Sequence, residues 1–220
     1  MDRVRYPMRL PRFVLLILLL TPLVACTIAP QRYSTPQAQT FTLQKGDLEA
    51  DGLAFLTPST VTGQEEDKQA LALIFASTVA QQHPTVRLVP LSATISAINQ
   101  AGLTDVYKGM YREYRDTGVF DPEALRQIGQ ATRARFLGQL KMAAFGQRNS
   151  GRFGIFGLDI VKTQTATIRL YFQIWDTHTG AIAWEGAEEL AAAYDTLAEK
   201  TVSFKSVVEE ATRELIALLP

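Results

Sequence analysis

The chain has 220 residues, of which 47% are hydrophobic and 20% charged, and its 22 basic and 22 acidic residues cancel at neutral pH. A balanced charge attracts phosphate backbones weakly, so the composition argues against nucleic-acid binding. The chain contains one cysteine and two histidines. It therefore forms no internal disulfide, and it has no residue spacing typical of a zinc site.

Residues 1–25 have the pattern of an export signal. Arginines at positions 3, 5, 9 and 12 flank or precede an apolar run at residues 13–20, which Thr21 and Pro22 interrupt. The run is shorter than the roughly 20 apolar residues of a membrane-spanning helix. We therefore expect residues 1–25 to be a secretory signal peptide.

The residues that end this signal, Leu23, Val24, Ala25 and Cys26, resemble the lipobox of bacterial lipoproteins. In that family the cysteine is lipidated on its thiol and becomes the new N-terminus. The resemblance implies that acyl chains on Cys26 anchor the protein in a lipid bilayer. Thr27 stands where the family commonly has an aspartate for inner-membrane retention, so the resemblance favours the outer membrane, with the domain facing the periplasm.

The segment behind Cys26 is polar. Residues 27–49 are rich in Gln, Thr, Ser and Pro and show no sustained hydrophobic periodicity, which is typical of a flexible linker. We therefore expect a lipidated flexible tether at residues 26–50 and a single folded domain at residues 51–220. The chain from Cys26 onward has a net charge of about −3.

The first half of this domain reads as alternating strands and helices. Strands are expected at residues 53–56 and 86–89, and a helix at 64–82 carries Leu71, Ile74, Phe75 and Val79 on one face, with Leu73 off that face. Shorter helices follow, and one begins at Asp121 and Pro122, which combine a capping side chain with a first-turn proline. A row of tyrosines at positions 107, 111 and 114 has helical spacing. We interpret it as a partly buried face with its hydroxyls at the water edge.

The second half changes to the period of a strand. Apolar residues alternate with polar ones at 136–142 and again at Ile168, Leu170, Phe172 and Ile174, and residues 176–180 form a turn before a returning strand that contains Trp184. A final apolar-faced helix follows. The order β-α-β-α-α-α-β-β-β-α predicts an α/β (α+β) fold with a mixed, partly antiparallel sheet covered by helices.

Residues 146–163 join two of these strands and are expected to form a long loop. The segment combines four glycines with two arginines and the apolar residues Phe153, Ile155 and Phe156. Mobile glycine-rich loops with apolar anchors often bind partners, so these three residues are candidate partner contacts. In the alternative interpretation they fold back and cover the sheet, and the two interpretations carry equal weight.

The segment at residues 170–184 reads LYFQIWDTHTGAIAW, a strand, a D-x-x-T-G turn and a returning strand. It resembles the hairpin of curli-secretion-type (CsgG-like) lipoproteins, a superfamily that includes penicillin-binding-protein activators and the amino-terminal domain of the Tol translocation protein. Residues 133–138, which read RARFLG, are similar to the strand entry of that group. The resemblance implies an envelope assembly or secretion role. The segment at 146–163 is too short to supply the two long membrane hairpins of a curli-type channel.

No residue pattern indicates a catalytic centre, a cofactor site or a metal site. No serine lies in a G-x-S-x-G elbow, and His83 and His178 fall at a helix end and in a turn. Two functions remain open: a non-enzymatic binding or assembly module for an envelope complex, with an unknown protein partner and possible oligomers, and an envelope hydrolase with an unrecognised acidic site. Clustering of Glu185, Glu188 or other acids in a deep pocket would favour the hydrolase.

Overall fold

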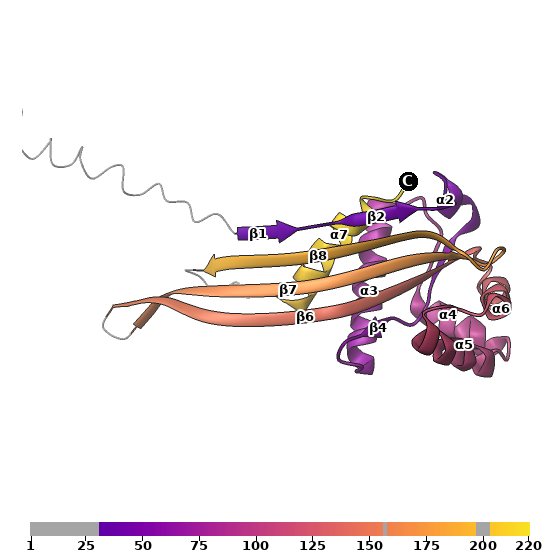
Figure 1. The fold of residues 1–220 in the computed structure, drawn as a ribbon, viewed down its shortest axis with the longest axis horizontal. Helices are drawn as coiled ribbons and strands as arrows, with labels where there is room; N and C mark the ends of the chain where they lie inside the picture. The colour runs from indigo at the N-terminus through magenta and orange to yellow at the C-terminus, as the bar shows by residue number, and fades with distance from the viewer. Residues whose placement is uncertain (1–30, 156–157, 197–202) are drawn as a thin grey trace, which may run out of the picture. The chain divides into compact units, whose positions relative to one another are not determined.

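The computed structural model describes residues 31–155, 158–196 and 203–220, with residues 31, 149–155, 158–163 and 194–196 described by their backbone alone. Within this part of the chain, an eight-stranded mixed sheet carries the helices on its faces (Figure 1). The strands are β1 (Gln31–Ser34), β2 (Gln37–Thr40), β3 (Leu53–Phe55), β4 (Ser59–Thr60), β5 (Leu88–Val89), β6 (Phe136–Ile155), β7 (Leu158–Asp176) and β8 (Ile182–Thr196). The helices are α2 (Asp47–Asp51), α3 (Glu65–Gln82), α4 (Leu91–Gln100), α5 (Thr104–Thr117), α6 (Pro122–Thr132) and α7 (Phe204–Ile216).

The order of the strands is β1-β8-β7-β6-β3-β5, with β2 also beside β8 and β4 beside β6. The short strands β3, β4 and β5 make the parallel pairs, whereas the long strands β6, β7 and β8 pair antiparallel. This arrangement confirms the predicted α/β fold class. The element order predicted from Leu53 onward is also confirmed, with the two-residue β4 as an addition.

One face of the sheet packs against α3 and α7. The alternating residues Ile168, Leu170, Phe172 and Ile174 are all buried on this face, as is Trp184. The ring of Phe172 lies 4.7 Å from that of Phe75 on α3 and 6.0 Å from that of Trp184. The predicted buried pair of strands is therefore confirmed, with its hydrophobic core on the α3–α7 side.

The opposite face is covered at one end by α4, α5 and α6, which cluster together in Figure 1. A second core lies there, and Leu137 and Trp175 contribute to it from β6 and β7. Ile174 faces the α3–α7 core and Trp175 faces this second core, so the two consecutive residues are both buried because helices cover both faces of the sheet here. The Trp175 ring lies 5.2 Å from Phe120, which links the end of β7 to the loop before α6.

Beyond these helices the same face of β7 is exposed. Thr165, Thr167, Arg169 and Tyr171 point outward along it, and Arg169 forms an ion pair with Glu189 on β8 at 2.9 Å. The described part of the chain places no helix over this stretch. We call these four residues, together with Glu189, the open sheet face.

The expectation of a flexible tether at residues 26–50 is wrong for residues 31–50. Strands β1 and β2 pair antiparallel with β8, and the side chains of Leu43 and Leu48 are buried in the core. The polar composition was misleading because an edge strand is held by backbone hydrogen bonds and can leave its side chains in water. The predicted signal peptide and Cys26 lie outside the described residues.

The expectation of a long loop at residues 146–163 is also wrong. The β6–β7 ladder continues from the pair Gly146 and Thr167 to the pair Ile155 and Leu158, so the segment extends the two strands to 20 and 19 residues. Residues 146–152 read GQRNSGR, without the alternation of apolar and polar residues that indicates a strand in a sequence. Phe153 and Ile155 lie at the end of β6, where the structure describes the backbone alone. Phe156 lies outside the described residues.

Candidate functional site

The acidic residues that could have formed a hydrolase site do not converge. Glu185 and Glu188 are three residues apart on β8, so strand alternation sends their side chains to opposite faces of the sheet. Glu185 accepts a hydrogen bond from Gln173 Nε2 at 3.1 Å and lines a hollow of about 350 Å³ in which it is the one carboxylate among the lining residues described. Glu188 is fully buried on the α7 side and accepts a hydrogen bond from Ser34 Oγ at 2.9 Å.

The two histidines lie in separate parts of the fold. His83 ends α3, with its backbone N–H donating to Val79 O at 2.8 Å, and His178 is exposed in the β7–β8 turn. Among the residues that the structure describes, no three histidine, cysteine or acidic side chains come close enough to bind a metal ion together. In the same part of the chain no helix is long and apolar enough to cross a bilayer.

The tyrosine row on α5 is partly buried, as predicted. The Tyr111 hydroxyl lies 2.7 Å from Thr57 O and 2.9 Å from Gln139 Oε1, and the Tyr107 hydroxyl accepts a hydrogen bond from Thr57 N at 2.9 Å. Burial raises the pKa of both phenols. The expectation that these hydroxyls lie at the water edge is wrong, because they hydrogen-bond the backbone after β3 and the buried amide of Gln139.

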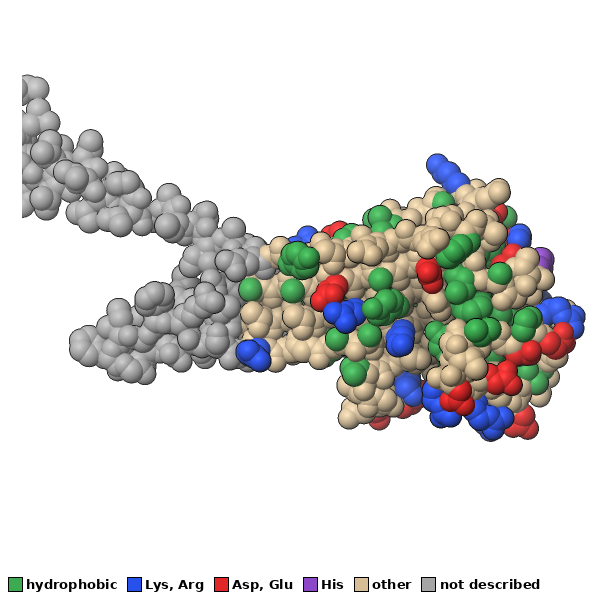
Figure 2. Space-filling view, in the orientation of Figure 1, with side chains coloured by type: hydrophobic (Ala, Val, Ile, Leu, Met, Phe, Trp, Pro, Cys, Tyr) green, Lys and Arg blue, Asp and Glu red, His purple; other side chains and the backbone are tan. Residues whose placement is uncertain are grey.

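A basic cavity of about 750 Å³ lies beside these tyrosines. Three elements supply its five cations: Lys68 from α3, Lys141 from β6, and Lys108, Arg112 and Arg115 from α5. The rest of its lining contains hydroxyl side chains, glycines, a proline and the rings of Tyr111 and Tyr114, without a carboxylate. Figure 2 shows basic side chains where the long strands meet α5. Because a cavity lined by one sign of charge concentrates its field, this cavity attracts anionic groups.

Nearby acids neutralise this cavity only in part. Lys68 and Lys108 pair with acids three residues before them at 3.4 Å and 3.7 Å, and Arg115 pairs with the next residue, Asp116, at 3.0 Å. These pairs are solvent-exposed and therefore weak. For Arg112 and Lys141 the described residues provide no ion pair within 4.0 Å, so both charges are available to a ligand.

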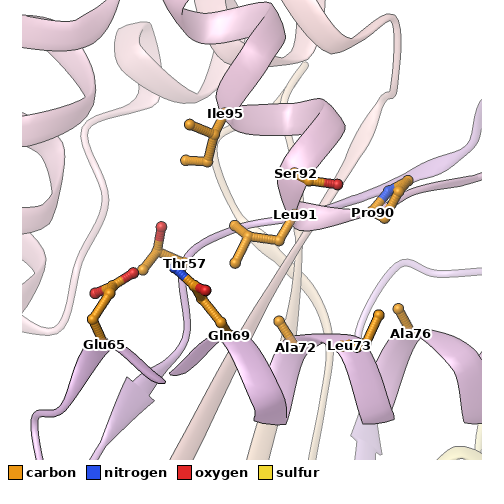
Figure 3. A pocket seen from close by; sticks show the side chains of 10 residues that line it. All are labelled: Thr57, Glu65, Gln69, Ala72, Leu73, Ala76, Pro90, Leu91, Ser92 and Ile95. Atoms are coloured by element: carbon orange, nitrogen blue, oxygen red, sulfur yellow. The ribbon is translucent and has the colours of Figure 1, made fainter. Parts of the chain in front are cut away.

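An apolar groove of about 580 Å³ runs between α3 and α4 (Figure 3). Ala72, Leu73 and Ala76 of α3 form one wall, and Leu91 and Ile95 of α4 form the other. Leu73 is 73% exposed, although most leucines in this fold are buried. Leu73, which does not belong to the apolar face predicted for α3, therefore lines this separate groove.

The basic cavity and the apolar groove adjoin, because Thr57 lines both. The first turns of α3 separate them: Lys68 faces the cavity, whereas Glu65 and Gln69 face the groove. We call the two hollows together the amphipathic cleft. It offers cations at one end and apolar side chains at the other, and it has the size range of ligand-binding pockets.

The sequence alone does not predict this cleft, although one of its features is recognisable there. Lys108, Arg112 and Arg115 are spaced by four and three residues, which places them on one face of a helix. The other contributions come from Lys68 and Lys141, about 40 and 30 residues away along the chain. The parallel pairing of β4 with β6 places Ser59 beside Lys141, and α3, which carries Lys68, begins five residues after the end of β4.

Comparisons with known proteins give structural likenesses alone. No family model matches the chain, and no curated protein sequence matches it. Among solved structures, the PelC dodecamer from Paraburkholderia phytofirmans aligns at a TM-score of 0.46 and 12% identity, covering 84% of this chain and 96% of that one. Lipoprotein GNA1162 from Neisseria meningitidis aligns at 0.41 and 11% identity, with coverages of 75% and 96%. The LpoB C-terminal domain from Salmonella enterica aligns at 0.34 and 16% identity, with coverages of 62% and 79%.

Proposed function

We propose that this chain is a lipid-anchored envelope protein that acts by binding a partner protein, without a catalytic step of its own. The observation that carries the proposal is the amphipathic cleft, in which cations from three elements adjoin apolar side chains from two helices. The arrangement of the acids supports it, since Glu185 and Glu188 point to opposite faces and share no cavity.

The anchoring part of the proposal depends on the N-terminal sequence. Cys26 behind an export signal is the proposed lipidation site, and Thr27 favours the outer membrane, with the folded domain in the periplasm. The hairpin of β7 and β8, with its D-x-x-T-G turn, fits the resemblance to CsgG-like envelope proteins. Residues Phe153, Ile155 and Phe156 remain proposed partner contacts, and self-association is compatible with this role.

Metabolic palmitate labelling tests the anchor. The native chain incorporates the label and fractionates with the outer membrane, and Cys26→Ala abolishes both. Thr27→Ala is the matched control, which keeps the label. Equal labelling of the Cys26→Ala protein would contradict the lipoprotein assignment.

Site-directed photo-crosslinking in membranes of the native host tests the binding function. A photoreactive residue is placed in turn at Ser92 beside the apolar groove, at Thr167 on the open sheet face, and at Lys205 on α7. A binding module gives a discrete protein adduct from at least one of these three surfaces. Monomeric protein without an adduct from any of them would contradict the proposed function.

A further inference from the structure

The geometry points to a specific occupant for the amphipathic cleft. We infer that it receives an acidic, amphipathic segment of a partner protein, with acidic side chains in the basic cavity and apolar side chains in the groove. The inference rests on the proposed binding function and adds to it the place and the chemistry of the contact.

The basic cavity supplies the charge complementarity. Arg112 and Lys141 project from α5 and β6 into the same hollow, and no ion pair within the described chain competes for them. Arginine can bind a carboxylate through two parallel hydrogen bonds. Complementary charges of this kind fix the register of a partner and accelerate its association.

The apolar groove supplies the anchoring contacts. Leu73, Leu91 and Ile95 project into it from two helices (Figure 3). Covering an exposed leucine removes apolar surface from water, which is the main favourable term in protein association. Apolar residues of a partner segment fill this groove, and acidic residues next to them in the segment reach the cations on the other side of Thr57.

Polar side chains in the groove favour a peptide over a lipid. Figure 3 shows the carboxylate of Glu65 and the amide of Gln69 on the groove side of α3, together with Ser92 on α4. A hydrocarbon chain would bury the Gln69 amide and the Ser92 hydroxyl without offering them hydrogen-bond partners, which is costly. A peptide brings backbone N–H and C=O groups that can pair with them.

The same groove disfavours an acidic polysaccharide. A glycan could neutralise the cations of the basic cavity, but its hydroxyl-rich surface would leave Leu73 and its neighbours without apolar partners. The cleft as a whole is therefore complementary to a protein segment that carries both acidic and apolar side chains.

The test uses the full-length chain in membranes of the native host, with the photoreactive residue at Ser92. Mass spectrometry identifies the adduct, which we expect to be one protein segment that carries acidic residues next to apolar ones. Arg112→Glu and Leu73→Ser each lower the adduct yield about tenfold, since each removes contact free energy of the order of 1.4 kcal/mol. Arg112→Lys retains most of the yield because it keeps the charge.

Matched changes elsewhere control for general effects. Lys205→Glu reverses an exposed charge on α7, and Leu218→Ser removes an exposed leucine near the C-terminus; both leave the yield unchanged. Because Arg112 and Leu73 are exposed, all variants keep the native melting temperature. A lipid or glycan adduct, a segment without acidic residues, or a yield insensitive to both cleft variants overturns the inference. An adduct obtained only from Thr167 overturns it while leaving the proposed binding function intact.

Discussion

Arg135 donates two hydrogen bonds to the buried carboxylate of Asp176, from Nε to Oδ1 at 3.2 Å and from Nη2 to Oδ2 at 2.8 Å. Its remaining nitrogen, Nη1, donates to Asp51 Oδ2 at 3.0 Å. Asp176 also accepts a hydrogen bond from the backbone N–H of His178 at 2.9 Å. One guanidinium thus joins the entry to β6, the end of α2 and the β7–β8 turn. The aspartate of the D-x-x-T-G motif is a structural residue of this turn.

Replacing Asp176 with alanine should destabilise the domain. The change removes a nearly buried acceptor of charge-assisted hydrogen bonds, and Arg135 is partly exposed, so we expect a loss of about 2 kcal/mol. Chemical denaturation followed by circular dichroism measures it. The exposed pair of Glu123 and Arg126 provides the control, since Arg126→Ala should leave the midpoint unchanged. An unchanged midpoint for Asp176→Ala would show that the turn does not need this carboxylate.

The same pair should make stability fall in acid. Burial raises the pKa of Asp176, but hydrogen bonds from Arg135 and from the His178 backbone outweigh it and hold the pKa below its usual value of 3.8. A group with a lowered folded pKa stabilises the fold above its unfolded pKa, and this stability is lost as the pH falls through the folded pKa. The native protein should therefore lose more stability below about pH 4 than Asp176→Asn does. Chemical denaturation at several pH values measures the free energy of unfolding of both proteins. An equal loss of this free energy in acid for the two proteins would contradict the expectation.

Glu188 should have the opposite pH dependence. Burial raises its pKa, a hydrogen bond from Ser34 lowers it in part, and the nearby charge of Glu214 raises it further. A raised folded pKa gives stability that is present below the usual value of 4.5 and is lost as the pH rises through the folded pKa. Glu188→Gln removes the buried charge, so its stability relative to the native protein should increase from acid toward neutral pH. Thermal melts at several pH values measure it, with the exposed Glu189→Gln as control; a difference that does not change with pH would refute the assignment.

Truncating Phe172 should test the main core. Its ring is fully buried between Phe75, Phe55 and Trp184, and Gly138 on β6 approaches it so closely that a Cβ there would lie 2.9 Å from the ring. Phe172→Ala should therefore cost about 3–5 kcal/mol. Reversible denaturant titration measures the loss, and Tyr171→Ala on the open sheet face is the neighbouring control with a small effect. A loss for Phe172→Ala below about 1 kcal/mol would show that this ring is not part of the core.

The end of the β6–β7 hairpin gives a separate prediction about partner contact. Changing Phe153, Ile155 and Phe156 together to serine should abolish partner capture while the melting temperature stays within a few degrees of the native value. Crosslinking yield and differential scanning calorimetry are measured on the same preparation. Changing Thr165 and Thr167 to serine on the same ladder is the control. Unfolding of the triple variant would show that these residues form core contacts instead.

The sequence by itself determined the elements whose side chains carry a period. Burial on one face of an element, or a local cap, produces a local sequence pattern. Such patterns predicted the apolar face of α3 at Leu71, Phe75 and Val79, the alternation along β7 and the start of α6 at Asp121 and Pro122. Asp121 does accept a hydrogen bond from Ala124 N at 2.7 Å. These elements and their order were sufficient to predict the fold class.

Tertiary structure decided the features that depend on backbone pairing or on distant residues. Strands β1 and β2 and the outer ladder of β6 and β7 are joined by backbone hydrogen bonds, whereas their polar or glycine-rich composition predicted a tether and a loop. The amphipathic cleft required Lys68, Arg112 and Lys141 to meet, and that meeting follows from parallel strand pairing across many residues. Long-range pairing leaves no periodic trace in a single sequence, because each residue contributes to it through a backbone that is chemically the same at almost every position.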